Sequence, residues 1–184
     1  MNFPQIETER LILRAFEETD AINIFNTYSF DEVTRYYDLE TMKDMSEATM
    51  ILNIFRQRFE EGKGLRWAIQ LKENGEYIGD GGFNFWDKHN CKSDIGYALI
   101  PKYWGKGLAS EAVRAMVKFG FSEKNIALKL NRLEAHTDPK NVKSRALLKR
   151  LGFQEEGILR DNCFEKGKFV DTVMHAILRR DFEI

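Results

Sequence analysis

The sequence predicts an α+β fold built around one mixed, mostly antiparallel sheet. Residues 65–71 and 76–86 have the composition of two antiparallel strands joined by a short glycine-containing turn. An apolar strand at 93–100 then passes through a glycine-containing bend into an amphipathic helix at 107–121. Because that helix leads to a further strand at 131–137, we expect those two strands to be parallel neighbours. The sheet is therefore expected to be antiparallel except at this one pair.

The segment before the hairpin predicts one strand and several helices. Leu11 and Leu13 alternate with Arg10, Ile12 and Arg14 in a strand at 9–16. Asp20 can cap a short helix, and a second short helical piece covers 31–36. A capping arrangement at Ser46, Glu47, Ala48 and Thr49 opens a longer helix, whose buried stripe is Ile51, Leu52, Phe55 and Phe59 and which ends at Gly62 or Gly64.

The C-terminal segment predicts one helix and two closing strands. A turn at 138–141 leads into a helix at 141–150, which Gly152 ends as a cap. Strands at 153–160 and 168–178 follow, joined by a loop that includes Gly167. Glycines inside the strand at 76–86 predict a bulge or a close backbone approach there.

Length and composition favour one soluble domain covering 1–184. A chain of 184 residues can bury a sizeable core without disulfides, and its two cysteines, Cys91 and Cys163, are expected to be free thiols in a reducing compartment. The N-terminus has neither a basic nor an apolar targeting segment, and no apolar run is long enough to span a membrane. We therefore expect a cytoplasmic protein with no membrane partner.

The charge is unevenly distributed along the chain. Residues 1–62 carry 13 acidic and 6 basic side chains, a net charge of −7, and residues 63–184 carry 16 and 22, a net charge of +6. The basic part would suit a phosphate ligand and the acidic part a cationic amine, although both can also be solvated faces. Basic residues are spread out and the isoelectric point is below neutral, so we expect no nucleic-acid partner.

The bend that follows the strand at 93–100 is the strongest functional signal. Gly105 and Gly107 allow backbone conformations in which successive N–H groups converge, and the new helix adds positive potential at its N-terminus. Such a bend can cradle a phosphate with main chain alone. The spacing matches neither a Walker A loop nor the dinucleotide fingerprint. An ordinary loop that caps a helix is the other interpretation.

The bend resembles the pyrophosphate loop of the GNAT superfamily of N-acetyltransferases. That loop has the pattern Gln/Arg-x-x-Gly-x-Gly/Ala, and here it reads Trp104-x-x-Gly107-x-Ala109, with tryptophan in the first position. Further segments resemble the branch that contains ribosomal-protein N-terminal and spermidine acetyltransferases, in the family's order over nearly the whole chain. They are Thr8-Glu9-Arg10-Leu11-Ile12-Leu13-Arg14, Asn131-Arg132-Leu133-Glu134-Ala135, Asn141-Val142-Lys143-Ser144, Leu151-Gly152-Phe153 and Gly167-Lys168-Phe169-Val170-Asp171.

The resemblance implies a GNAT fold and acetyl-CoA as cosubstrate. The fold would be a six- to seven-stranded sheet splayed between strands 4 and 5, with helices on both faces. The cofactor's pantetheine arm would pair with the strand edge before the bend, and Asn141 and Ser144 would also contact the cofactor. The expected cofactor-binding residues are Tyr97, Ala98, Leu99, Trp104, Gly105, Lys106, Gly107, Leu108, Ala109, Ser110, Asn141 and Ser144.

The implied reaction is direct attack of a primary amine on the thioester, which requires a base. Asp94 starts the strand before the bend, where the family often has an acidic residue. Glu134 and His136 share one face of the neighbouring strand by period-two spacing, and histidine has the better intrinsic pKa. Each also has a structural interpretation, as a turn residue, an ion-pair partner or a core histidine. Tyr28, Tyr36 and Tyr37 are candidates for substrate contact or for core filling.

The sequence departs from the superfamily where a general acid is common. Many members carry a tyrosine seven residues after the helix-opening Asn141, but here that position is Leu148. Ser144 is the candidate donor to the departing sulfur, as its counterpart is thought to be in the ribosomal-protein branch. A protein N-terminal α-amine is the favoured acceptor, and a polyamine or other small amine is the alternative. A third hypothesis is that the protein is a non-catalytic acyl-CoA sensor. The histidines lack ligand spacing, so we expect no metal, and a homodimer is left open.

Overall fold

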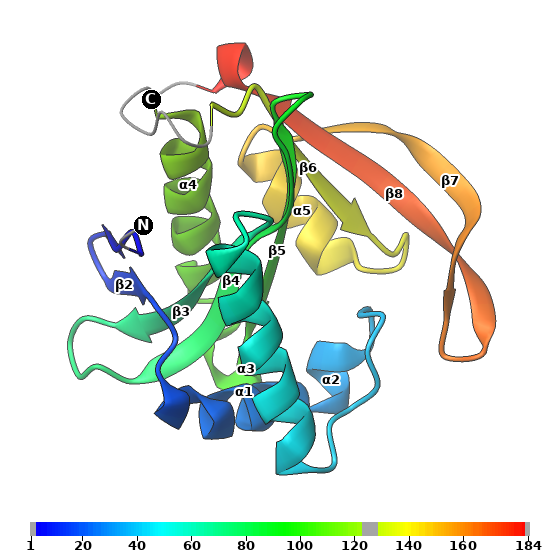
Figure 1. Ribbon diagram of the computed structural model, residues 1–184. Coiled ribbons are helices and arrows are strands. Elements are labelled where there is room, and N and C mark those ends of the chain that lie inside the picture. Colours follow the sequence, from blue (N-terminus) through cyan, green and yellow to red (C-terminus); the bar gives the residue numbers. More distant parts are fainter. Residues whose placement is uncertain (1–2, 123–128, 183–184) are drawn as a thin grey trace.

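A computed structural model describes residues 3–122 and 129–182 and contains one eight-stranded sheet of order β1-β2-β3-β4-β5-β6-β8-β7 (Figure 1). Every adjacent pair is antiparallel except β5 and β6. The strands are β1 (Ile6–Glu7), β2 (Leu11–Arg14), β3 (Leu65–Leu71), β4 (Tyr77–Asp87), β5 (Lys92–Leu99), β6 (Arg132–Thr137), β7 (Gln154–Glu165) and β8 (Lys168–Leu178). The helices are α1 (Ala21–Tyr28), α2 (Asp31–Thr34), α3 (Met45–Glu60), α4 (Leu108–Phe121) and α5 (Val142–Arg150).

The predicted α+β fold and its splayed sheet are confirmed. Strands β5 and β6 pair only at their first three residues, the last pair being Asp94 and Glu134. Beyond that pair β5 stays with β4 as far as Leu99, and β6 stays with β8 as far as Thr137. The pairing of β5 with β6 therefore stops while each strand continues beside its other neighbour. Figure 1 shows β5 and β6 diverging. The eighth strand is the two-residue β1, which the sequence pattern did not predict.

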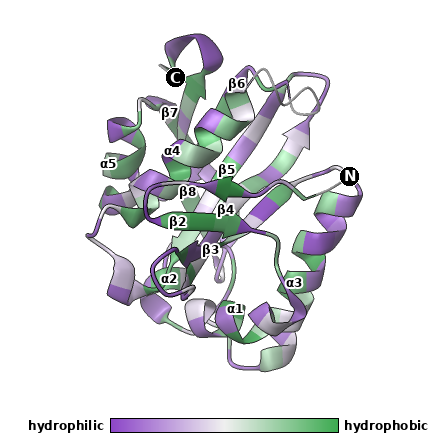
Figure 2. Cartoon of the chain, turned by 90° about the vertical axis from the view of Figure 1, so that its left-hand side faces the viewer, coloured by the Kyte–Doolittle hydropathy of each residue, from purple (hydrophilic) through white to green (hydrophobic). Residues whose placement is uncertain are grey.

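Helices cover both faces of the sheet. Side chains alternate along β3, so Trp67 and Ile69 pack in one apolar cluster and Ala68 packs in another on the opposite face. The first cluster includes the buried sides of α4 and α5, and the second includes those of α1 and α3. The hydropathy colouring in Figure 2 shows apolar residues along the strands that lie between these helices.

Several element boundaries differ from the sequence-based expectation, and the start of α3 and the end of β7 are the ones that bear on the site. Asp44 caps α3 instead of Ser46: its carboxylate accepts from the Ser46 backbone N–H, and the Glu47 carboxylate accepts from the Asp44 backbone N–H. The predicted position was two residues late because Ser46 and Asp44 are both good caps. Strand β7 also continues to Glu165 and forms, with β8, a long hairpin that projects from the body of the molecule (Figure 1).

Candidate active site

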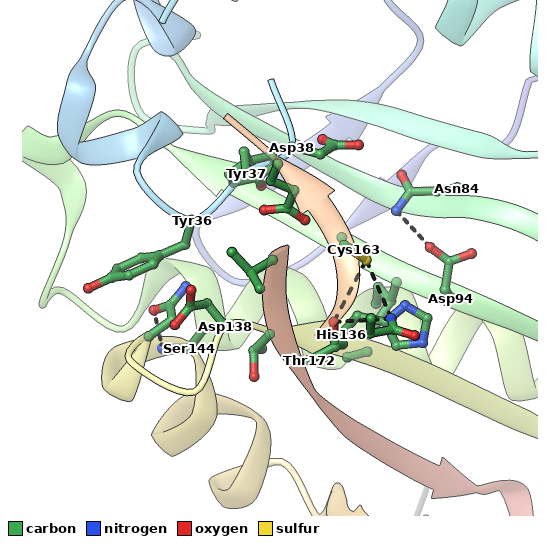
Figure 3. A pocket seen from close by; sticks show the side chains of 18 of the residues that line it. Tyr36, Tyr37, Asp38, Asn84, Asp94, His136, Asp138, Ser144, Cys163 and Thr172 are labelled. Atoms are coloured by element: carbon green, nitrogen blue, oxygen red, sulfur yellow. Dashed lines mark hydrogen bonds between the residues drawn. The ribbon is translucent and has the colours of Figure 1, made fainter. Parts of the chain in front are cut away.

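A cleft of about 310 Å³ opens where β5 and β6 part. Its walls come from six parts of the chain, and Figure 3 draws most of the side chains that line it. The lining residues are Tyr36, Tyr37 and Asp38 after α2; Asn84 on β4; Asp94, Ile95, Gly96 and Tyr97 on β5; Ala135, His136, Thr137 and Asp138 on β6 and its turn; Asn141, Ser144 and Leu148 at α5; and Asn162, Cys163, Glu165, Val170, Asp171 and Thr172 on the β7–β8 hairpin.

The bend between β5 and α4 has the backbone that the phosphate cradle requires. Gly105 and Gly107 adopt φ values of +75° and +78°, a left-handed conformation that favours glycine. A Cβ built at Gly105 would meet no atom within 4 Å, and one at Gly107 would meet only Arg10 Nη2 at 3.5 Å. The first helical bond runs from the Glu111 N–H to the Gly107 carbonyl. The N–H groups of Leu108, Ala109 and Ser110 therefore precede the intrahelical ladder and have no partner within α4.

A buttress from the N-terminal strands supports this bend, and the sequence pattern did not predict it. Arg10 Nη1 donates to the Lys106 carbonyl at 3.1 Å, and Arg10 Nε lies 2.7 Å from Glu111 Oε2. Glu111 Oε1 also accepts from the Thr8 hydroxyl at 2.6 Å. Burial opposes ionisation of Glu111, but the bonds from Thr8 and Arg10 dominate and lower its pKa. The bend is thus tied to the connection between β1 and β2, in part through one carboxylate on α4.

The edge of β5 beyond the splay carries the residues expected to pair with a pantetheine arm. The Tyr97 carbonyl accepts from the Tyr37 hydroxyl at 2.6 Å, and the Leu99 carbonyl accepts from Trp104 Nε1 at 2.7 Å. Both carbonyls therefore point away from β4 and toward the splay, as an added strand would need, and each already has one side-chain donor. Ala98 lies between them with its side chain in the core.

The structure separates the three candidate bases. Asp94 and His136 line the cleft, and Asp94 Oδ2 accepts from Asn84 Nδ2 at 3.0 Å (Figure 3). Glu134 is paired with Arg132 at 2.7 Å and Lys92 at 3.3 Å, and among the described residues it is not part of the cleft lining. Burial works against the Glu134 carboxylate, but both cations together lower its pKa. The ion-pair interpretation of Glu134 therefore matches its surroundings.

A tyrosine hydroxyl lies beside Ser144, but it comes from β5 and not from α5. Tyr97 Oη is 2.8 Å from Ser144 Oγ. Burial raises the pKa of Tyr97 to about 12, so the phenol keeps its proton. Asn141 Oδ1 accepts from the Ser144 backbone N–H and caps α5, and Leu148 presents only carbon to the cleft. Tyr97 was expected to bind the pantetheine arm through its main chain only. The contact of its side chain could not be predicted from local sequence, because Ser144 is 47 residues away.

The described lining of the cleft carries five carboxylates and no lysine or arginine. Glu165 lies at the end of β7, and burial together with the nearby charges of Asp38 and Asp138 raises its pKa. Mutual repulsion of this kind would be relieved by a bound cation. The remaining carboxylates are those of Asp94 and Asp171.

The three tyrosines considered from the sequence divide into two roles. Tyr36 and Tyr37 line the cleft, whereas Tyr28 is buried and donates to Asp80 at 2.9 Å. Within 3–122 and 129–182, no three His, Cys, Asp or Glu side chains are placed to hold a metal ion. None of the helices in these ranges is long and apolar enough to cross a membrane.

Comparison with known proteins identifies the family. The protein-family model described as "Acetyltransferase (GNAT) domain" matches residues 10–154. The uncharacterized N-acetyltransferase YoaA of Bacillus subtilis is 40% identical over 177 residues, which are 96% of this chain and 98% of that protein. The [ribosomal protein uS5]-alanine N-acetyltransferase of Escherichia coli is 26% identical over 193 residues, covering 98% of this chain and 95% of that protein.

Two solved structures share the fold and contain coenzyme A. RimL, a ribosomal L7/L12 α-N-protein acetyltransferase in complex with coenzyme A, has a TM-score of 0.85 at 20% identity, covering 95% of this chain and 98% of its own. A spermidine N-acetyltransferase from Vibrio cholerae, with CoA and spermine, has a TM-score of 0.80 at 21% identity, covering 95% and 97%. A family match over most of the chain and a relative at 40% identity agree. The chain therefore belongs to the GNAT acetyltransferases and is an N-acetyltransferase.

Proposed function

We propose that this enzyme transfers the acetyl group of acetyl-CoA to a cationic primary amine that enters the carboxylate-lined cleft, and that the favoured acceptor is the N-terminal α-amine of a protein. The observation that carries the proposal is the cleft itself: it lies where two strands separate, and its described lining has five carboxylates and no lysine or arginine. A wall of this charge attracts an ammonium group before the group loses its proton.

The donor would be held by main chain. The N–H groups of Leu108, Ala109 and Ser110 would bind the diphosphate, and the edge of β5 at Tyr97 and Leu99, which β6 leaves unpaired, would bind the amides of the arm. An extended arm along this edge would bring the thioester to the cleft between β5 and β6. A β5 N–H near Leu99 would then stabilise the oxyanion that forms on attack, an effect that is typically worth about 3 kcal/mol.

The amine must be neutral when it attacks. An α-amine with a pKa near 8 loses its proton at a cost of about 1.4 kcal/mol at pH 7, whereas a lysine-like amine near 10.4 costs about 4.6 kcal/mol. Asp94, which lines the cleft and stands at the point of separation, is the proposed base, directly or through one water. His136 is the alternative base in the same cleft.

The transfer itself breaks one bond and forms one. The amine nitrogen bonds to the acetyl carbon, the carbon–sulfur bond breaks, and the proton taken from the amine leaves through the base. The thiolate of coenzyme A accepts a hydrogen bond from Ser144 Oγ, which Tyr97 Oη in turn contacts. This hydroxyl pair occupies the cleft beside Leu148, so the missing tyrosine on α5 does not argue for a non-catalytic sensor.

A polyamine is the second candidate acceptor. The observation that favours it is the spread of the carboxylates over separate walls, with Asp38 and Glu165 on two different segments from Asp94. Several ammonium groups on one chain would match several separated carboxylates. The solved spermidine acetyltransferase with spermine shows that this fold accommodates such a ligand.

A thiol-release assay distinguishes these readings. Three reactions each contain the enzyme, acetyl-CoA and one amine. The amines are a peptide that has a free N-terminus, the same peptide with a blocked N-terminus and an internal lysine, and spermidine. We expect turnover with the free peptide and little with the blocked one. Turnover confined to spermidine would remove the protein acceptor, and binding of acetyl-CoA without turnover on any amine would remove the proposed function.

A further inference from the structure

We propose that Asn84 is a positioning residue for Asp94, and that its amide is held in turn by the buried Arg66–Asp80 ion pair. The inference rests on the proposed function, in which Asp94 is the base. It assigns a role to three polar residues on β3 and β4 that the sequence pattern did not mark as functional.

Asn84 lies at a bulge that turns its side chain into the cleft. In the β4–β5 ladder Phe83 pairs with Ile95 and Phe85 pairs with Asp94, so Asn84 is the extra residue between two consecutive pairs. An extra residue of this kind re-aims side chains and is common next to active sites. Asn84 and Asp94 consequently lie on the same wall of the cleft, as Figure 3 shows.

The ion pair behind Asn84 is buried and has several hydrogen-bond partners. Arg66 and Asp80 are 7% and 0% exposed, and Arg66 Nη2 lies 2.6 Å from Asp80 Oδ1. The Asp80 carboxylate also accepts from the hydroxyls of Tyr28 and Tyr77, both at 2.9 Å. A buried carboxylate with this many donors fixes the guanidinium that it faces.

The guanidinium decides which way the Asn84 amide points. Arg66 Nη1 donates to Asn84 Oδ1 at 2.7 Å. Because arginine has donors and no acceptor, the amide must turn its oxygen toward Arg66 and its NH₂ toward Asp94. That NH₂ donates to Asp94 Oδ2 at 3.0 Å, which fixes one carboxylate oxygen and orients the other for the amine.

Gly96 provides the room that this arrangement needs. A Cβ built at position 96 would lie 2.8 Å from Asn84 Nδ2 and 3.4 Å from Arg66 Nη1. Any larger side chain there would displace the amide from its place between Arg66 and Asp94. Residues from three neighbouring strands therefore hold the Asn84 amide in place, and that amide alone donates to Asp94 Oδ2.

The test is a double-mutant cycle on kcat, with the affinity for acetyl-CoA and the melting temperature measured for each variant. The variants are Asn84→Ala, Asp94→Asn and the double variant, with Asn90→Ala as a matched control. Asn90 is exposed on the β4–β5 turn, where it donates to Asp87. Asn84→Asp is a fifth variant, because it keeps the size of the side chain and an acceptor for Arg66 but loses the donor to Asp94.

We expect Asn84→Ala and Asn84→Asp to lower kcat by about 10-fold or more, a part of the roughly 10²- to 10⁴-fold that a general base contributes. The affinity for acetyl-CoA should stay within about 2-fold in both. In the Asp94→Asn background, Asn84→Ala should change kcat by less than about 2-fold, since residues that act as one unit are not additive.

Three results would overturn the inference, and they are distinguishable from one another. Equal losses for Asn84→Ala in both backgrounds would show that Asn84 acts independently of Asp94. A wild-type kcat in Asn84→Asp would show that only size and the Arg66 contact matter, which is a structural role. A wild-type kcat in Asp94→Asn would remove Asp94 as the base and the inference with it, whatever Asn84→Ala does.

Discussion

The hydroxyl of Tyr97 on β5 lies 2.8 Å from the hydroxyl of Ser144 on α5, across the gap between the separated strands. This contact joins the strand edge that would hold the pantetheine arm to the helix that carries the proposed thiolate donor. It also places a phenol beside Leu148, where the superfamily often has a tyrosine on the helix.

The first prediction concerns this pair. Ser144→Ala should lower kcat by about 10- to 100-fold, since a hydrogen bond to a charged group contributes about 1.5–3 kcal/mol. Tyr97→Phe should lower kcat less, because Ser144 keeps its hydroxyl but loses its partner. The measurement is kcat together with calorimetric affinity for coenzyme A, with Ser29→Ala as the control. An unchanged kcat in Ser144→Ala would mean that solvent, and not Ser144, donates the hydrogen bond to the departing thiolate.

The second prediction concerns Asp94. Asp94→Asn removes the proposed proton acceptor but keeps the bond geometry, so turnover should fall much more than affinity for acetyl-CoA. The measurement is the rate on a free-N-terminus peptide across pH 6–9, beside calorimetry on the same preparation. A wild-type rate over the whole range would contradict the assignment and leave His136 as the base.

The third prediction concerns Glu165. Its pKa is raised in the folded protein by burial and by Asp38 and Asp138, so the folded state binds more protons than the unfolded state in the interval between the two pKa values. Stability is lost as the pH rises through that interval. Glu165→Gln should therefore raise the melting temperature at pH 7, with the gain disappearing below about pH 4.

The same Glu165 variant should weaken acceptor binding. Removing one wall charge should raise the KM for a cationic amine with little effect on kcat, because Glu165 is not in contact with Asp94. Glu73→Gln, on the exposed β3–β4 turn, is the matched control for both measurements. An unchanged amine KM would show that the carboxylates on the hairpin do not take part in acceptor recognition.

The fourth prediction concerns the buttress of the bend. Arg10→Ala removes the donor to the Lys106 carbonyl and the partner of Glu111. Because the Arg10 side chain is 46% exposed, we expect only a modest loss, about 3- to 10-fold in affinity for acetyl-CoA. Calorimetry measures it. A stronger affinity in the variant would mean that Arg10 obstructs the cradle instead of supporting it.

Local sequence signals predicted the main elements of the sheet. Strand β3 begins and ends where the composition of residues 65–71 indicated, and α4 is capped by Gly107 at the expected bend. Such signals lie within a few residues of one another, so a single sequence reveals them. The splay was expected from the strand–helix–strand unit together with the resemblance to the GNAT superfamily, and the pairing that stops at Asp94 confirms it.

Contacts between distant residues account for what the sequence did not reveal. Asn84 is functional in our proposal only because a bulge turns it toward Asp94, and glycines in β4 predicted a bulge or close approach without its position. Tyr97 and Ser144 are 47 positions apart, and Arg10 and Glu111 are 101 apart. The pairing register and the order of the strands bring these residues together, and local sequence periodicity predicts neither of them.

The central claim is that main-chain amides at Gly107 and the start of α4 bind the diphosphate of acetyl-CoA, and calorimetry on two glycine variants tests it most directly. Gly75→Asp is the control, because Gly75 has a φ of +71° and, like Gly107, room for a Cβ, but lies on the β3–β4 turn. We expect Gly75→Asp to bind acetyl-CoA like the wild type and Gly107→Asp, which places a carboxylate against the diphosphate, to show no binding heat. Wild-type affinity in a folded Gly107→Asp would contradict the claim.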